Sequence, residues 1–302
     1  MHATQSITIV KKAFHDLLAK NPMRIAAATA FFATFALPAI VLIIIEVTGL
    51  FYNPSAVKKG IFPQLVSVIG RQSSVKVYEI LNRFVELAHN WIAAILGFLF
   101  LVFVVTNLFG VVRNSINELW NVKLQRKVNL KFYLKMRLKS TIIIAFACIV
   151  LVTQLIATAL QIFLKDYIRE VWNNYNPVIY AIASQLIFIV ITACWFSVLF
   201  KYLANAHPDW QTALTGGIFT AILFTAGKII LGFLLTSSGL SAVFGKSGSF
   251  VLILLFVFYS SFIFYYGASF THALLLERKK KLHLEKHAYL FTIKEVRSGQ
   301  VK

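Results

Sequence analysis

Two charged residues stand inside long apolar stretches of the chain. Glu46 lies near the end of the stretch 25–51, and Lys228 lies within the stretch 213–236. Charged side chains inside such segments are costly and by default suggest a function and a partner. If both segments are helices, their depths differ by only about 5 Å, at about 1.5 Å per residue, which a lysine side chain can bridge. We therefore predict that they approach each other; the alternative is that each extends separately to the membrane interface.

A second polar group surrounds the end of the apolar stretch 91–112. Asn107, Asn114 and Asn117 are spaced seven and ten residues apart, and Arg113 adds a cation. This spacing places the three amides roughly on one helix face. Such a group can bind a phosphate or another head group. Helix-end capping and ordinary hydrogen bonds between helices explain the same residues equally well.

The sequence lacks the short motifs of several common enzyme classes. It contains no G-x-x-x-x-G-K-[ST] phosphate loop, no H-E-x-x-H or C-x-x-C, and no G-x-S-x-G. His283 and His287 are four residues apart on an expected tail helix, but the lysines around them oppose a metal cation. We therefore expect no enzymatic activity, no metal and no cofactor.

Long apolar stretches make up most of the chain and must position these residues. Hydrophobic residues account for 59% of the 302 residues and charged ones for 14%, against about 45–50% and about 25% in soluble domains. A bilayer core is crossed by about 20 apolar residues, so we predict an all-α integral membrane protein with six spans. The predicted spans are 25–51, 91–112, 141–164, 178–200, 213–236 and 249–275.

Amphipathic and basic segments flank these spans, which together form a membrane domain over 25–276. Residues 1–24 carry apolar positions at helical spacing, which predicts an interfacial helix that Asn21-Pro22 ends. A second interfacial helix is predicted in the loop 52–90, and residues 277–302 form a basic tail. The apolar stripe of this second helix consists of Val77, Ile80, Leu81, Phe84 and Ala88.

Proline and small residues are expected to shape the packing of the spans. Pro38 lies in the middle of the first span and predicts a kink, because it cannot donate a backbone hydrogen bond. The alanines before it predict a face for close helix packing. Gly216, Gly217 and Gly227 of the fifth span are assigned structural roles.

The positions of the basic residues predict the orientation of the spans. The formal net charge of +19 would favour nucleic acid as the partner of a soluble protein. Here 21 of the 30 Lys and Arg fall on one side of the predicted membrane, 8 fall on the other, and Lys228 lies within a span. Cytoplasmic loops collect basic residues, so both termini are predicted to be cytoplasmic and no nucleic-acid partner is expected.

Four stretches of the sequence together form a pattern that can be compared with known protein families. They are AAATAFFATFALPAIVLII in the first span, Asn117–Val122 after the second, Trp210–Leu235, and Gly245–Ser249 leading into the last span. Over about residues 10–280 their order and spacing resemble the YihY/BrkB group of bacterial inner-membrane proteins, formerly mislabelled as ribonuclease BN. The resemblance implies an inner-membrane protein tied to the envelope, with lipid or lipopolysaccharide transport suspected, and gives no support to ribonuclease activity.

The resemblance also bears on single residues of the last two spans. Gly227-Lys228 is similar to a feature of the group, which favours a role for Lys228. Where relatives often carry an acidic residue at the end of the last span, this chain has Ser269. A partner for Lys228 would then be missing there, so either Glu46 matters more here or the acidic position is dispensable.

These features together favour a six-span inner-membrane bundle that moves or presents an amphipathic envelope molecule, a lipid or lipopolysaccharide precursor. Its expected partners are membrane lipids, with anionic head groups at the cytoplasmic face. The alternative is a structural adaptor that docks an envelope-assembly protein. The candidate transport residues are Glu46, Lys228, Asn107 and Ser269, and the candidate head-group contacts are Arg113, Asn114 and Asn117.

Overall fold

Long helices make up most of the computed structural model, which describes residues 3–49, 66, 71, 74–75, 77–79, 91–124, 177–237, 248–285 and 287–292. The long helices are α1 (Ala3–Leu18), α2 (Pro22–Gly49), α5 (Trp91–Leu119), α7 (Pro177–Tyr202), α8 (Trp210–Ser237) and α10 (Gly248–Glu277). Short strands follow some of them: β1 (Val122–Leu124), β2 (Ala206–His207), β3 (His283–Leu284) and β4 (Ala288–Leu290).

Five of the predicted spans coincide with helices, namely α2, α5, α7, α8 and α10. The third predicted span, 141–164, lies outside the described residues. Among the described residues, three segments are long and apolar enough to cross a membrane: Gln185–Tyr202, Trp210–Leu231 and Phe250–Glu277. The apolar stretch Pro22–Ala36 of α2 is shorter. α5 continues beyond residue 112 to Leu119, so the predicted head-group residues lie on the helix itself.

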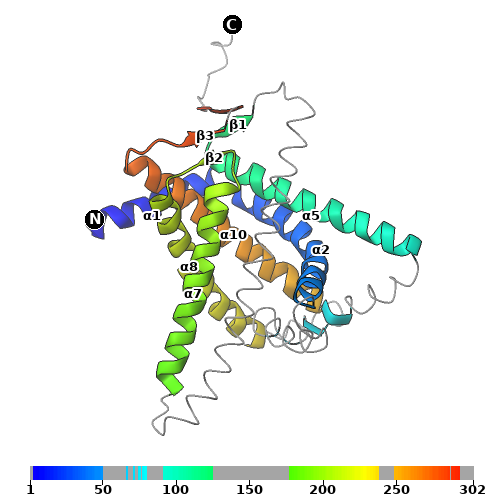
Figure 1. The fold of residues 1–302 in the computed structure, drawn as a ribbon. Helices are drawn as coiled ribbons and strands as arrows, with labels where there is room; N and C mark the ends of the chain where they lie inside the picture. The colour runs from blue at the N-terminus through cyan, green and yellow to red at the C-terminus, as the bar shows by residue number, and fades with distance from the viewer. Residues whose placement is uncertain are drawn as a thin grey trace.

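α10 is the central helix of the described bundle. It packs against α1, α2, α5, α7 and α8, and Figure 1 shows α7 and α8 on one side of it and α2 and α5 on the other. The indole of Trp120, just after α5, donates a hydrogen bond of 2.9 Å to the Ala268 carbonyl of α10. The hydroxyls of Thr29 in α2 and Tyr265 in α10 lie 2.5 Å apart. Buried polar contacts therefore fix both neighbours to the middle of the bundle.

The N-terminal segment forms the predicted amphipathic helix, α1. Its Ile9, Ala13 and Leu17 are buried, while Phe14 and Leu18 of the same predicted stripe are exposed. Ile9 and Ala13 pack with apolar residues of α10, so this face of α1 is covered by protein. Of the second predicted interfacial helix, only residues 77–79 are described, and they are helical.

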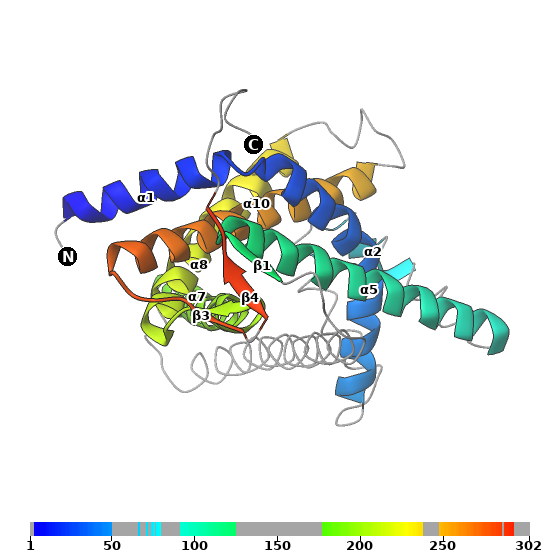
Figure 2. The same ribbon diagram turned by 90° about the horizontal axis from the view of Figure 1, so that it is seen from above.

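α2 continues through Pro38 as one helix. Figure 2 shows its second half running in a different direction from its first half, which is the effect expected of a proline within a helix. The side chain of Pro38 itself lies outside the described part. Ala26 and Ala30, two of the alanines predicted to pack closely, are buried.

Glycines bring α8 close to its two neighbours, which agrees with their predicted structural role. A Cβ at Gly217 would overlap the Ser197 hydroxyl of α7. A Cβ at Gly216 or at Gly227 would overlap Thr271 or Tyr259 of α10, respectively. At Gly217 the added Cβ would also meet the Ala193 carbonyl and the Ser197 nitrogen of the α7 backbone, so only glycine permits the approach there.

Large apolar side chains are exposed on the outward faces of α7 and α8. In a soluble protein a surface of this kind would be unusual, whereas helices surrounded by lipid expose such faces by default. The side chains in question are Ile182, Leu186, Val190, Ile218, Ile222, Ile229 and Ile230.

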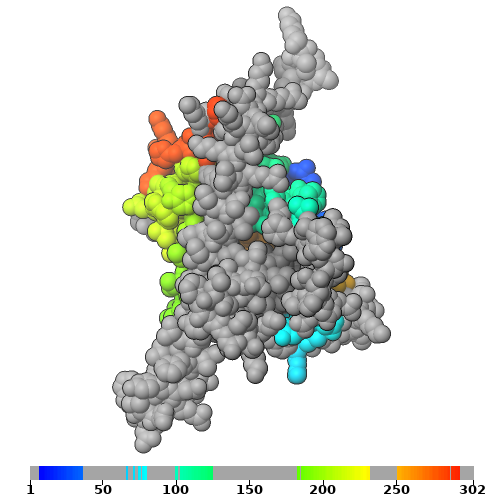
Figure 3. Space-filling view, turned by 45° about the vertical axis from the view of Figure 1, so that its right-hand side comes forward, coloured from blue at the N-terminus to red at the C-terminus, as the bar shows by residue number. Residues whose placement is uncertain are grey.

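Two small antiparallel sheets close one end of the bundle, and the prediction of an all-α fold missed them. β1 pairs with β4, with Lys123 opposite Tyr289, and β2 pairs with β3, with Ala206 opposite Leu284. The chain after α10 therefore returns onto the segments that follow α5 and α7, and Figure 3 shows this orange segment against yellow-green residues of that region. We call residues 19–24, 113–124, 201–212 and 278–292 the polar end.

Replacing Gly217 with alanine should destabilise the bundle by about 1–3 kcal/mol, because overpacking has a cost of that order. The matched control is Gly110→Ala in α5, where nothing lies within 4 Å of the added Cβ. Thermal unfolding in detergent should give a lower midpoint for Gly217→Ala and an unchanged or slightly higher one for Gly110→Ala. Equal midpoints for the two variants would contradict close packing between α7 and α8.

Candidate functional site

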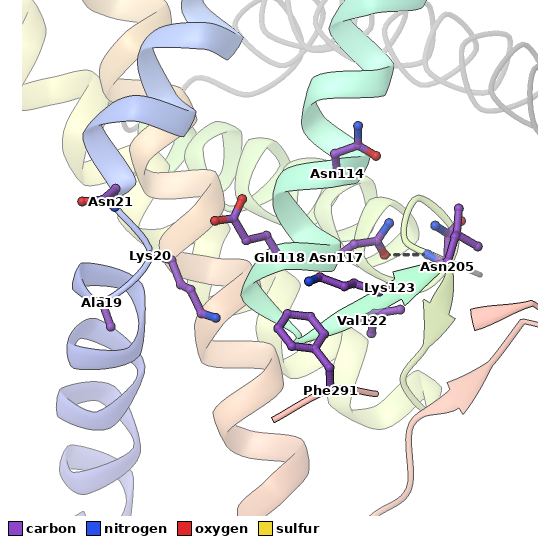
Figure 4. Close-up of a pocket in the computed structure, with 11 residues that line it drawn as sticks. Ala19, Lys20, Asn21, Asn114, Asn117, Glu118, Val122, Lys123, Asn205 and Phe291 are labelled. Carbon is purple, nitrogen blue, oxygen red and sulfur yellow. Dashed lines mark hydrogen bonds between the residues drawn. The ribbon is translucent and has the colours of Figure 1, made fainter. Parts of the chain in front are cut away.

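A cavity of about 520 Å³, lined mainly by polar residues, lies at the polar end. Its walls come from the α1–α2 turn, the last turns of α5, β1, the α7–α8 connector and the residue after β4, and Figure 4 shows these side chains. We call this cavity the end pocket. Its main polar and aromatic lining residues are Lys20, Asn21, Asn114, Asn117, Glu118, Lys123, Asn205 and Phe291.

The turn between α1 and α2 forms one wall of the end pocket. Asn21 has a φ of 51°, a left-handed conformation that asparagine tolerates better than most residues. Asn21-Pro22 separates the two helices, as the sequence predicted, and α2 begins at Pro22, three residues before the predicted start of the span. Arg24 forms an ion pair of 2.9 Å with Glu118 of α5. Lys20 donates a hydrogen bond of 2.8 Å to the Asn121 side-chain oxygen. These contacts attach the turn to the end of α5.

The end of α5 and the tail form the opposite wall. Asn121 follows α5 with a φ of 52°, which ends the helix in a left-handed residue and allows β1 to begin at Val122. The backbone N–H of Phe291 donates to the Asn121 carbonyl at 2.9 Å. With the register of β1 and β4, this bond holds the Phe291 ring in the pocket wall.

Two lysines from different elements converge on that ring. The ammonium nitrogens of Lys20 and Lys123 lie 5.7 Å and 4.4 Å from the centroid of the Phe291 ring. In Figure 4 both side chains reach toward Phe291, one from the α1–α2 turn and the other from β1. The negative face of the Phe291 ring thus attracts two cations into the wall of the end pocket. The charge of these two ammonium groups favours an anion as the ligand.

The structure brings two of the predicted head-group residues into the end pocket and leaves the third out. Asn114 and Asn117 line it. Asn117 also accepts a hydrogen bond of 2.9 Å from the backbone N–H of Asn205. Arg113 points elsewhere: it is only 5% exposed and donates a 3.2 Å bond to the Leu203 carbonyl. Its predicted contact with a head group is therefore replaced by a contact within the protein.

Arg113 belongs to a partly buried polar cluster that adjoins the end pocket at Asn205. The carboxylate of Glu285 stabilises the charge of its guanidinium, which burial disfavours. Glu285 also lies 3.4 Å from the ring nitrogen of His207, and its N–H donates to the Asn205 carbonyl at 3.0 Å. The tail thus supplies the acid that accompanies a buried cation of α5.

Two predicted transport residues bind backbone carbonyls. Asn107 donates to the Phe103 carbonyl at 2.8 Å within α5. Ser269 is buried and donates to the Ala13 carbonyl at 2.7 Å, so it attaches α1 to α10. Neither is among the residues that line the end pocket.

The predicted approach of Glu46 and Lys228 stays a prediction. Glu46 lies in α2, but its side chain lies outside the described part. The ammonium nitrogen of Lys228 lies 4.1 Å from the centroid of the Phe188 ring of α7. Such a cation–π contact gives a lysine partial stabilisation away from water.

The predicted tail helix is wrong. His283 belongs to β3, and His287 precedes β4, so the two histidines do not occupy neighbouring positions on one helix. Among the described residues, no group of three or more His, Cys, Asp or Glu is placed to hold a metal ion.

Sequence reasoning missed the residues on which the end pocket depends. Lys20, Lys123, Asn205 and Phe291 are far apart along the chain. The strand pairings, together with the hydrogen bonds of Lys20 to Asn121 and of Asn205 to Asn117, bring them together. The available signal was weak, because Ala288–Leu290 is a short uncharged run within a basic tail. From the sequence alone, a basic tail of this kind is interpreted as a segment surrounded by water, because its pairing with β1 cannot be seen.

Asp209 directly precedes α8 and joins the start of this helix to the tail. Its carboxylate accepts bonds from the Thr212 N–H at 3.3 Å and the Thr212 hydroxyl at 2.5 Å, which caps the helix. Lys280 donates to the same carboxylate at 2.8 Å. Burial raises the pKa of Asp209, but the hydrogen bonds from Lys280 and Thr212 outweigh it and lower the pKa from 3.8 to about 2.

Comparisons with known proteins place this architecture among bacterial membrane proteins. The family model described as Virulence factor BrkB matches residues 13–289. A UPF0761 membrane protein of Paraburkholderia xenovorans is 27% identical over 70% of this chain and 47% of its own length. One of Saccharophagus degradans is 24% identical, over 86% of this chain and 58% of its own length. The chain thus spans about half the length of these relatives. No solved structure matches the chain.

The carboxylate of Asp209 should contribute stability that disappears in acid. Its folded pKa of about 2 lies below the ordinary 3.8, so the contribution is complete above about pH 4 and is lost as the pH falls through about 2. Asp209→Asn keeps a capping side chain but loses the charge. At pH 7 it should lower the free energy of unfolding by about 1 kcal/mol.

Unfolding in detergent at a series of pH values measures this effect. The difference between Asp209→Asn and the parent should shrink toward pH 2. Glu277→Gln, which changes an exposed acid at the end of α10, should show no such trend. A difference for Asp209→Asn that stays constant with pH would contradict the role of its charge.

Proposed function

Because the chain belongs to the Virulence factor BrkB family and its relatives are membrane proteins, we propose that it is a multi-pass protein of the bacterial inner membrane. Six spans and two cytoplasmic termini agree with the distribution of its basic residues. In this orientation the polar end, with the end pocket, faces the cytoplasm.

Its proposed role is to move or present an amphipathic envelope molecule, a lipid or lipopolysaccharide precursor, without catalysing a reaction. One observation supports this role: a cavity lined by two lysines and several amides lies at the end of helices whose sides expose apolar side chains. An amphipathic molecule has a polar head and apolar chains, so it can meet both surfaces at once.

Polar groups within the helices favour movement across the membrane over simple binding. Among the described residues, Gln185 Nε2, Thr225 Oγ1 and Ser260 Oγ are buried without a hydrogen-bond partner. They lie on α7, α8 and α10, respectively, and Lys228 lies near Thr225 along α8. Buried polar atoms are nearly always satisfied, so unpartnered ones invite water or a polar ligand.

A different role, that of a structural adaptor, is favoured by the surface of the tail. Tyr289 and Leu290 of β4 are exposed, and an exposed apolar strand residue is an anchor that a docking protein can bury. An adaptor would bind its envelope-assembly partner stably and would move no lipid.

Replacing Lys228 with alanine should reduce lipid movement about tenfold, which corresponds to about 1.4 kcal/mol, because the variant removes a cation from the interior of the helices. The assay reconstitutes the full chain in proteoliposomes and follows a fluorescent phospholipid between leaflets. Lys12→Ala, at an exposed position of α1, is the control and should keep the parent rate. No protein-dependent movement in the parent, together with co-purification of an envelope protein, would favour the adaptor.

The same assay tests the Glu46–Lys228 pair. Each charge alone inside the membrane is costly, so the double variant Glu46→Gln/Lys228→Met should recover activity that either single variant loses. Coupling of this kind is the signature of residues in contact. If the losses of the two single variants simply add, the two residues do not form a pair.

A further inference from the structure

Building on the proposed function for the source of the ligand, we propose that the end pocket binds a phosphate-type oxyanion between Lys20 and Lys123, beside Phe291. The sequence directed attention to Arg113, Asn114 and Asn117. In the structure, the positive charge that lines the end pocket instead comes from Lys20 and Lys123, which the sequence did not single out.

The first observation is the convergence of the two ammonium groups. Each lies within 6 Å of the same Phe291 ring centroid, at 5.7 Å for Lys20 and 4.4 Å for Lys123. The two charges therefore lie no farther apart than the sum of these distances, and they repel each other. An anion between them replaces this repulsion with two attractions.

The second observation is the distribution of the remaining charges. Among the described residues that line the end pocket, Glu118 is the one carboxylate, and Arg24 holds it at 2.9 Å. The hydrogen-bond partner of Lys20 is the neutral amide of Asn121. The described lining therefore carries more positive than negative charge.

The third observation concerns the amides. The backbone N–H of Asn205 can only donate, so the Asn117 atom 2.9 Å from it is the side-chain oxygen. The nitrogen of Asn117 is then the end that can donate to a ligand. Asn114 adds a second amide, one turn earlier on the same wall of the pocket. Amide donors and ammonium groups together suit an acceptor with several oxygens.

A phosphate monoester fits this set better than a carboxylate. It carries about −1.5 to −2 charge near neutral pH and three acceptor oxygens, so it can engage both lysines and an amide together. A cavity of about 520 Å³ has room for the phosphate and the group that it esterifies. Two sources supply this chemistry, a lipid head group and free phosphate.

The test measures binding to the full chain in nanodiscs of phosphatidylcholine. The probes are dihexanoyl phosphatidic acid, inorganic phosphate and dihexanoyl phosphatidylcholine. Phosphatidic acid and phosphate should bind, and phosphatidylcholine should not. Lys20→Ala/Lys123→Ala should weaken phosphatidic acid binding at least tenfold. Binding should also weaken as salt rises, since the contacts are ionic.

Matched variants separate the loss of charge from the loss of structure. Lys123 is exposed, so Lys123→Gln should keep the parent unfolding midpoint and still weaken binding severalfold. Lys123→Arg keeps the cation and should restore binding. Lys12→Ala on α1 should leave affinity unchanged.

The outcomes distinguish this site from the proposed function. If phosphate binds through both lysines but phosphatidic acid does not, the result supports the oxyanion site and contradicts the proposal that the protein handles lipid through it. If phosphatidic acid binds with the same affinity to the parent, Lys123→Gln and the double variant, the site is wrong although lipid binding survives. Absence of binding by both anions overturns the site as well.

Discussion

The polar end is held together by the tail, which follows α10 and pairs with the segments that come after α5 and α7 in the sequence. β4 pairs with β1 and β3 pairs with β2, so the tail joins two connectors that are far apart in sequence. It also supplies Glu285 beside the buried Arg113 and Lys280 beside Asp209. A buried cation left without its acid is strongly destabilising, which is why the arrangement of this end depends on the docked tail.

The end pocket is a consequence of this docking. Phe291 reaches the pocket wall because its N–H is bonded to the Asn121 carbonyl, and the two lysines gather around its ring. The surrounding helices pack against α10. Close contacts at Gly216 and Gly217 fix the position of α8 against its neighbours. The helices thus provide a rigid support, while short loops and strands carry the residues that can meet a ligand.

The helices were predictable from the sequence because long apolar runs leave few alternatives. The Asn21-Pro22 break was also predictable, since both residue types have strong local preferences. The strands were not, because β2 and β3 are two residues long and exist only through pairing between distant segments. Asn114 and Asn117 could be proposed as ligand contacts because they share one helix face. Phe291 could not, because it reaches the pocket only through pairing between distant segments. Arg113 directly precedes Asn114 in the sequence, but the turn of the helix directs it to Leu203.

Hydrogen–deuterium exchange of residues 283–292 tests most directly whether the docked tail builds the site. In the full chain in nanodiscs, the amides of β4 and Phe291 should exchange more slowly than those of an unfolded chain, because they are paired with β1 and Asn121. Dihexanoyl phosphatidic acid should slow them further, since a ligand that binds the docked form stabilises it. Exchange at the unfolded rate, with or without the anion, would contradict the account.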